Sequence, residues 1–184
     1  MKLKTLITTA VTTVLSAAIV LPAQASDGTI SFSGSITATT CTITVTGGGA
    51  AAGATATVNM QAGKVADLDA AGKTAGSTDF NVNLSSCTVA NGLTQGVAVN
   101  FESGANVNAN GHLSNTGTAT GVDLAIYPRG STTALKLGDA PVSSTRNIAG
   151  GSVSLPYTVK YLRTAGAVAA GTVRSNVTYS IAYF

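Results

Sequence analysis

The sequence lacks most of the residue types from which enzymes build active sites. It contains no tryptophan, one histidine and two cysteines, and only 9% of its 184 residues are charged. A metal centre needs several ligands at close spacing, and a catalytic cysteine needs a neighbouring base. The single histidine, His112, lies in a Gly- and Asn-rich stretch where a solvated side chain is expected. We therefore expect no catalytic residue, no metal and no cofactor.

Long apolar runs are also scarce, and the one that exists lies at the N-terminus. Lys2 and Lys4 precede an apolar run over residues 6–21, and residues 23–25 read Ala-Gln-Ala. A basic start, a short apolar core and a small-x-small site are typical of a cleaved secretory signal. A membrane anchor is the alternative, but the run is short and diluted by hydroxyl side chains. We predict that residues 1–25 are a signal peptide.

The mature chain would begin at Ser26 and form a single domain without an integral membrane segment. Two of the ten basic residues lie in the signal, so eight basic residues face seven acidic ones in the mature part. No Lys/Arg cluster occurs there. A nearly neutral chain without a basic patch is not expected to bind nucleic acid.

The two cysteines, Cys41 and Cys87, both lie in the mature part of an exported chain. Export to an oxidising compartment favours a disulfide over two free thiols. Such a bridge closes a loop of about 47 residues and contributes roughly 4 kcal/mol by the chain-entropy estimate.

Alternating apolar and polar residues recur along the mature chain, separated by Gly, Asn and Ser clusters. This pattern favours an all-β, immunoglobulin-like two-sheet sandwich. Pro156 lies within the strongest internal run and predicts an edge strand or a bulge there. Residues 65–71 could form one helical turn, and residues 135–137 a brief pairing. The expected strands are 42–45, 55–60, 80–84, 97–101, 122–127, 153–161 and 177–184.

A further alternating segment, residues 30–36, stands close to the predicted signal. Ile30, Phe32 and Ile36 share one face with Gly34, and serines occupy the other face. The connection to the next strand contains threonines and no turn-forming residue, so a tight reversal is disfavoured. The segment is then expected to project from the domain. An ordinary first strand of a complete sandwich is the alternative.

The other end of the chain supplies a partner for the projecting segment. The last strand has one apolar face and stops without any residue left to cover its free edge. The domain can therefore be interpreted as a sandwich one strand short, which a neighbouring copy completes. Burial of the three large side chains of the segment would supply roughly 5 to 9 kcal/mol. The residues of the last strand expected to face the core are Val177, Tyr179, Ile181 and Tyr183.

These features together resemble the structural subunits of chaperone–usher fimbriae, in particular the major subunits of type 1-like pili. The resemblance rests on the extension 28–36, with its glycine two residues after the aromatic, and on Cys41 soon after it. It also rests on Cys87, on Gly171 as the fourteenth residue from the C-terminus, and on the penultimate Tyr183. Each mark is weak alone, but their order and spacing span the whole mature chain.

The resemblance implies three segments and a set of partners. The segments are a signal peptide (1–25), a donor-strand extension (26–38) and an incomplete pilin domain (39–184). The implied partners are further fimbrial subunits, in a homopolymer, together with a periplasmic chaperone and an outer-membrane usher. The chain would pass through the periplasm to a fimbrium on the cell surface and support cell adhesion.

The resemblance also assigns roles to individual residues. Ile30, Phe32, Gly34 and Ile36 would form the donor strand. The Phe184 carboxylate would be anchored by basic residues of the chaperone, although many relatives end in a polar residue instead. The residues expected to border the acceptor groove or to contact the chaperone are Gly171, Val173, Val177, Tyr179, Ile181, Tyr183 and Phe184.

Three other functions compete with this interpretation. The first is an enzyme, because residues 72–74 read Gly-Lys-Thr as in a phosphate-binding loop, but Asp67 stands where that motif needs glycine. Asp67 and Asp69 could pair as carboxylates or bind a cation, although a hydrated loop suits them better. The second is a secreted monomeric module that binds carbohydrate or a host molecule. The third is a minor or tip pilin that acts as an adapter.

Overall fold

A computed structural model describes the chain from the first strand of the domain to the C-terminus, apart from short gaps. The predicted signal peptide (1–25) and donor-strand extension (26–38) lie outside the described residues. None of the helices in the described part has the length and apolarity that crossing a bilayer requires. The described residues are 40–50, 53–88, 96–139 and 145–184.

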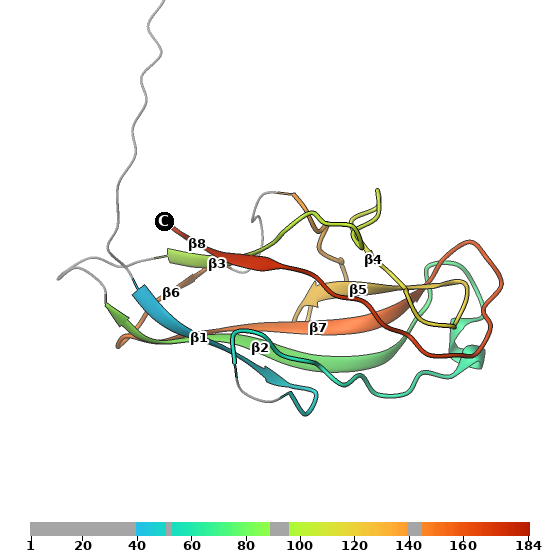
Figure 1. Ribbon diagram of the computed structural model, residues 1–184, viewed down its shortest axis with the longest axis horizontal. Coiled ribbons are helices and arrows are strands. Elements are labelled where there is room, and N and C mark those ends of the chain that lie inside the picture. Colours follow the sequence, from blue (N-terminus) through green and yellow to red (C-terminus); the bar gives the residue numbers. More distant parts are fainter. Residues whose placement is uncertain (1–39, 51–52, 89–95, 140–144) are drawn as a thin grey trace, which may run out of the picture. The chain divides into compact units, whose positions relative to one another are not determined.

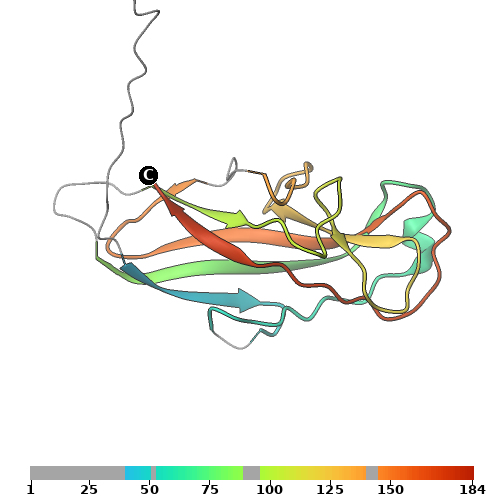
Figure 2. The same cartoon turned by 45° about the horizontal axis from the view of Figure 1, so that its top comes forward.

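The described residues form two antiparallel sheets, as Figure 1 and Figure 2 show. The larger sheet has the order β1-β2-β7-β5-β4, and the smaller has the order β6-β3-β8. The predicted all-β sandwich is thereby confirmed. The elements are β1 (Thr40–Gly47), the 3-10 helix η1 (Val65–Leu68), β2 (Thr74–Thr88), β3 (Gly96–Phe101), β4 (Leu113–Ser114), β5 (Val122–Pro128), β6 (Arg146–Asn147), β7 (Val153–Arg163) and β8 (Tyr179–Tyr183).

The core lies between the two sheets and is centred on Tyr157. This side chain is fully buried, as are Leu84 and Leu155 beside it. Its ring stacks on Phe80 of the same sheet, with 5.6 Å between ring centroids, and meets the edge of Phe101 of the other sheet at 5.2 Å. Such aromatic pairs add stability beyond the area that they bury. The two sheets are therefore joined through one aromatic cluster.

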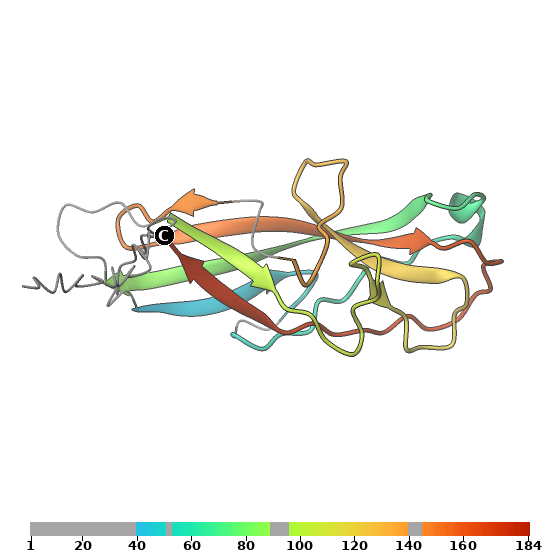
Figure 3. The ribbon, with the colours of Figure 1, turned by 90° about the horizontal axis from the view of Figure 1, so that it is seen from above.

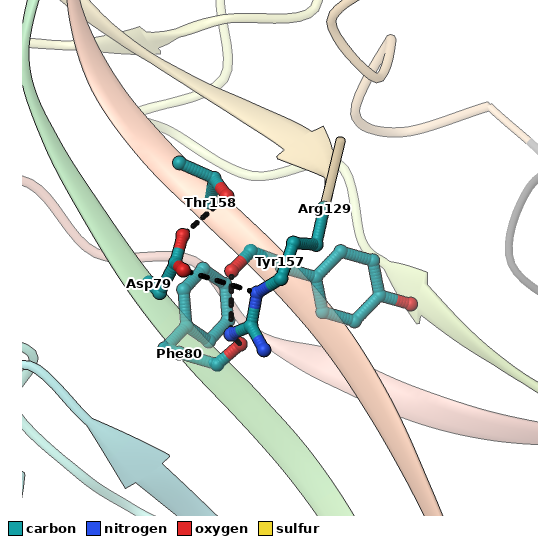
Figure 4. A network of polar contacts seen from close by, with 5 residues as sticks. All are labelled: Asp79, Phe80, Arg129, Tyr157 and Thr158. Carbon is teal, nitrogen blue, oxygen red and sulfur yellow. Dashed lines mark hydrogen bonds and ion pairs between the residues drawn. The ribbon is translucent and has the colours of Figure 1, made fainter. Parts of the chain in front are cut away.

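A polar network crosses the outer face of the larger sheet, as Figure 4 shows. The Arg129 guanidinium, from the end of β5, pairs with Asp79 of β2 at 3.2 Å and donates to the Phe80 carbonyl oxygen at 3.2 Å. The Thr158 hydroxyl of β7 donates to the same carboxylate at 2.6 Å. Because Arg129 and Asp79 are partly exposed, the ion pair itself contributes little. Its effect is to connect three strands, β5, β7 and β2, at one point.

The position of Pro156 differs from the prediction of an edge strand. β7 lies between β2 and β5, so Pro156 occupies a central strand. Its carbonyl oxygen accepts a hydrogen bond from the Arg129 N–H at 3.1 Å, one residue beyond the end of β5. The N–H and C=O groups of one residue in an antiparallel strand point toward the same neighbouring strand. The N–H that Pro156 lacks would therefore point toward β5, just beyond its last residue. The proline is tolerated because β5 stops there.

Three smaller expectations can also be compared with the structure. The predicted turn within residues 65–71 is confirmed as η1. Residues 135–137 form no strand, although the Leu135 N–H donates to the Ile126 carbonyl at 2.7 Å and the Leu137 N–H to the Gly111 carbonyl at 3.1 Å. Residues 55–60 were expected to form a strand, but they have no strand assignment. The reason for that error lies in the site described below.

A disulfide joins Cys41 of β1 to Cys87 of β2, as predicted. β1 is an edge strand of the larger sheet and has only β2 as its strand partner in the described part of the chain. The bridge therefore secures one edge strand of the larger sheet to its strand partner.

Replacing both Cys41 and Cys87 by alanine should lower the free energy of unfolding by roughly 4 kcal/mol, because the unfolded chain regains the entropy of an open loop. Urea denaturation followed by circular dichroism measures the change. Wild-type protein treated with a reductant is the control and should match the double variant. A loss below about 1 kcal/mol would contradict the expected role of the bridge.

Candidate strand-binding furrow

The outer edge of β8 is the first wall of the candidate site. Its inner edge is paired with β3, beside which it lies in Figure 3. Gly96 and Phe184 exchange two backbone hydrogen bonds, of 3.3 and 2.8 Å. This pair fixes which residues of β8 direct their main-chain groups toward β3. Alternate residues of an antiparallel strand direct their N–H and C=O groups to opposite sides. The residues of β8 that direct these groups away from β3 are therefore Tyr179, Ile181 and Tyr183.

The same alternation continues through the segment before β8. The carbonyl oxygens of Thr172, Arg174 and Thr178 accept backbone N–H groups from residues 102–119, at 2.8 to 3.0 Å. These even-numbered residues bond to the side on which β3 lies. The odd-numbered residues between them face the other way and have no backbone partner within the described ranges. They are Val173, Ser175 and Val177.

The second wall is the segment 53–60, which bends at residues 54 and 55. The Gly53 carbonyl accepts the Val45 N–H of β1 at 2.8 Å, and the Asn59 N–H donates to the Gly48 carbonyl at 2.9 Å. Because these residues bond toward β1, the alternate residues direct their main-chain groups away from it. Residues 55–60 are not a strand because the described chain pairs with them only at isolated points on the β1 side and not at all on the other side. The residues that this alternation turns away from β1 are Ala56, Val58 and Met60.

The space between the two walls is apolar, and we call it the furrow. One end contains a cavity of about 350 Å³, which lies between Met60 and Val173. Leu68, Val122 and Tyr161 line it further, and Lys64 is its one charged lining residue. The side chains of both walls pack against the core while remaining only partly buried. They are Ala56, Val58 and Met60 from the second wall, and Val173, Val177, Tyr179, Ile181 and Tyr183 from the first.

The chemistry of the furrow suits packing better than reaction. Burial raises the pKa of the Tyr161, Tyr179 and Tyr183 hydroxyls, which therefore stay neutral well beyond physiological pH. The described ranges contain no group of three potential metal ligands. Asp67 and Asp69 are exposed, as the hydrated-loop interpretation expected.

Gly171 holds the first wall in place from behind. A Cβ at this position would lie 2.4 Å from the Ala119 nitrogen and 2.7 Å from the Thr118 carbonyl carbon. These are backbone atoms that cannot swing aside. On this side the chain exchanges hydrogen bonds between Thr118, Ala119 and Thr172. Glycine is therefore required for the close approach that supports the wall.

The predicted site residues can now be placed. Five of them, Val173, Val177, Tyr179, Ile181 and Tyr183, lie along the first wall, and Gly171 lies at the cavity end. Phe184 is 59% exposed at the C-terminal end. The predicted donor residues Ile30, Phe32, Gly34 and Ile36 lie outside the described residues.

Sequence reasoning missed the second wall as part of the site. The alternation of residues 55–60 was read correctly, but their role as a wall depends on a contact with residues far away in the sequence. Ser175 was also missed. Its hydroxyl is buried and has no hydrogen-bond partner among the described residues.

Comparison with known proteins decides the family. Residues 30–183 match the pattern that defines the family described as "Fimbrial protein". The chain belongs to this family. It is 33% identical to the F17 fimbrial protein of Escherichia coli over 171 residues, which are 89% of this chain and 94% of the relative. It is 36% identical to the major fimbrial subunit SMF-1 of Stenotrophomonas maltophilia over 177 residues, covering 91% and 98%.

Solved structures of pilus subunits have the same fold. The P pilus rod subunit PapA matches with a TM-score of 0.57 at 18% identity, over 71% of this chain and 94% of that one. A subunit of a chaperone–usher pilus, solved to explain rod uncoiling, matches with a TM-score of 0.58 at 18% identity, over 86% and 96%. The chain is thus a fimbrial subunit with an immunoglobulin-like pilin fold.

Replacing Gly171 by alanine should destabilise this fimbrial subunit by roughly 1 to 3 kcal/mol, because the new methyl group would overlap the backbone of Thr118 and Ala119. Urea denaturation measures the change. Gly104→Ala is the matched control, since a Cβ there would meet no atom within 4 Å. Equal stabilities of the two variants would show that the wall does not depend on the close approach.

Proposed function

We propose that the subunit polymerises by donor-strand exchange, in which the extension 26–38 of one copy enters the furrow of the next. The observation that carries the proposal is the pair of facing walls. Each wall presents unpaired main-chain groups and half-buried apolar side chains toward the same space. A single added strand satisfies both requirements, because it pairs through its backbone and fills the core with alternate side chains.

The dimensions and chemistry of the two parts are compatible. Residues 28–36 in extended form would span about 30 Å, and the first wall, residues 173–183, spans about 35 Å. Ile30, Phe32 and Ile36 would face the core, and the serines between them would face solvent. The furrow is nearly uncharged, and so is the segment. Hydrophobic burial therefore supplies most of the free energy of joining.

An open furrow also explains why a chaperone would be needed. An exposed edge with apolar side chains readily pairs with the wrong chain. We infer that a periplasmic chaperone lends a strand to the furrow after export, and that an outer-membrane usher replaces it by the extension of the next subunit. The likeness to a subunit of a chaperone–usher pilus supports this route. The product would be a homopolymeric fimbrium at the cell surface that supports cell adhesion.

The donor strand can be tested with two matched substitutions of equal size and charge. Gly34→Arg would place a long side chain on the face that enters the furrow and should abolish polymerisation of the mature chain. Ser33→Arg would place the same side chain on the solvent face and should leave polymerisation intact. Denaturant-resistant oligomers on gels report the result, and electron microscopy of the fibres confirms it. Fibres of normal length from Gly34→Arg would refute the assigned face.

Chaperone capture can be tested at the other end of the chain. Deleting Tyr183 and Phe184 removes the end of the first wall and should reduce the periplasmic level of the subunit to background. The control exchanges the two residues, as Tyr183→Phe with Phe184→Tyr, and keeps the length and aromatic character. Immunoblotting of periplasmic extracts measures the level. An unchanged level after the deletion would argue against capture at this strand.

A further inference from the structure

One hydrogen bond crosses the furrow from wall to wall. The Tyr179 hydroxyl, from the first residue of β8, donates to the Ala54 carbonyl oxygen at 2.7 Å. The two residues are separated by 125 positions in the sequence. Within the described ranges, no other hydrogen bond joins residues 53–60 to residues 171–184.

We propose that this bond is a latch, which ties the two walls across the furrow and must open before a strand can enter. The inference rests on the proposed function, since a latch regulates strand entry only if a strand enters. The latch would determine how fast two subunits join, whereas donor-strand exchange determines which segment joins them. A bond that must break before the strand enters slows insertion without contributing to the assembled state.

The span of the latch agrees with the width of one strand. Neighbouring strands lie about 4.8 Å apart, so walls that admit a single strand stand about 9.5 Å apart. A tyrosine side chain and one hydrogen bond together reach roughly that far. The latch therefore occupies a path across the space that the entering strand needs.

The acceptor of the latch also lies where an entering strand would pass. The Ala54 carbonyl oxygen is directed into the furrow, since it accepts the Tyr179 hydroxyl from the opposite wall. A strand that entered between the walls would bring its own main-chain groups beside this carbonyl, where the Tyr179 side chain now lies. Strand entry and the latch thus compete for the space beside one carbonyl.

Tyr127 provides a comparison outside the furrow. It lies in β5, belongs to neither wall, and has the Lys160 Nζ 4.8 Å from its ring centroid. Removing the Tyr127 hydroxyl therefore takes one tyrosine oxygen from the same domain without changing either wall or the latch.

The experiment measures the rate at which a fluorescent peptide copying residues 28–38 binds to monomeric mature subunit, by stopped-flow anisotropy. Tyr179→Phe should speed binding about three- to tenfold, the effect of removing one net hydrogen bond. Tyr127→Phe should stay within about twofold of wild type. Tyr179→Met, an unbranched side chain without the hydroxyl, is the second variant in case the first does not fold by circular dichroism.

The outcomes separate the latch from the proposed function. Faster binding by Tyr179→Phe alone supports the latch. Equal rates for wild type and Tyr179→Phe would overturn the latch and leave strand insertion standing. Slower binding by Tyr179→Phe would also overturn it, because the bond would then hold the furrow open. No binding by any of the proteins would overturn both proposals.

Discussion

Main-chain hydrogen bonding along two facing edges governs this molecule. Residues 173–183 and 53–60 each use one edge for pairing within the domain, and no main-chain pairing along the other edge occurs among the described residues. A main-chain group without a partner is costly once water is excluded. The furrow is also lined with half-buried apolar side chains, and water filling the furrow would leave these side chains exposed. An additional strand resolves both deficits at once.

The rest of the fold keeps the two walls apart. The first wall is held from behind by β3 and by residues 102–119, with Gly171 permitting the closest approach. The second wall is held by β1, which the disulfide of Cys41 and Cys87 fastens to β2. The Tyr157 cluster fixes the distance between the sheets. These supports hold the two walls from behind, and the proposed donor strand would enter the space between them.

Much of the fold follows from local patterns in the sequence. Period-two alternation predicted the long strands, and the export signal with two cysteines predicted the disulfide. Local patterns were insufficient where a distant element decides the structure. Residues 55–60 alternate like a strand but gain no regular partner, and Pro156 is tolerated centrally only because β5 ends beside it. The bond from Arg129 to Asp79 likewise depends on which strands become neighbours. The donor role of residues 30–36 stays a prediction.

The most direct test of an open furrow is amide hydrogen exchange along β8, compared between the monomeric mature subunit and its assembled fibre. In the monomer, the amides of Tyr179, Ile181 and Tyr183 should exchange quickly, while those of Ser180 and Ala182, bonded to β3, should exchange slowly. In the fibre, all five should exchange slowly. Slow exchange of the three odd-numbered amides already in the monomer, or fast exchange in the fibre, would contradict the account.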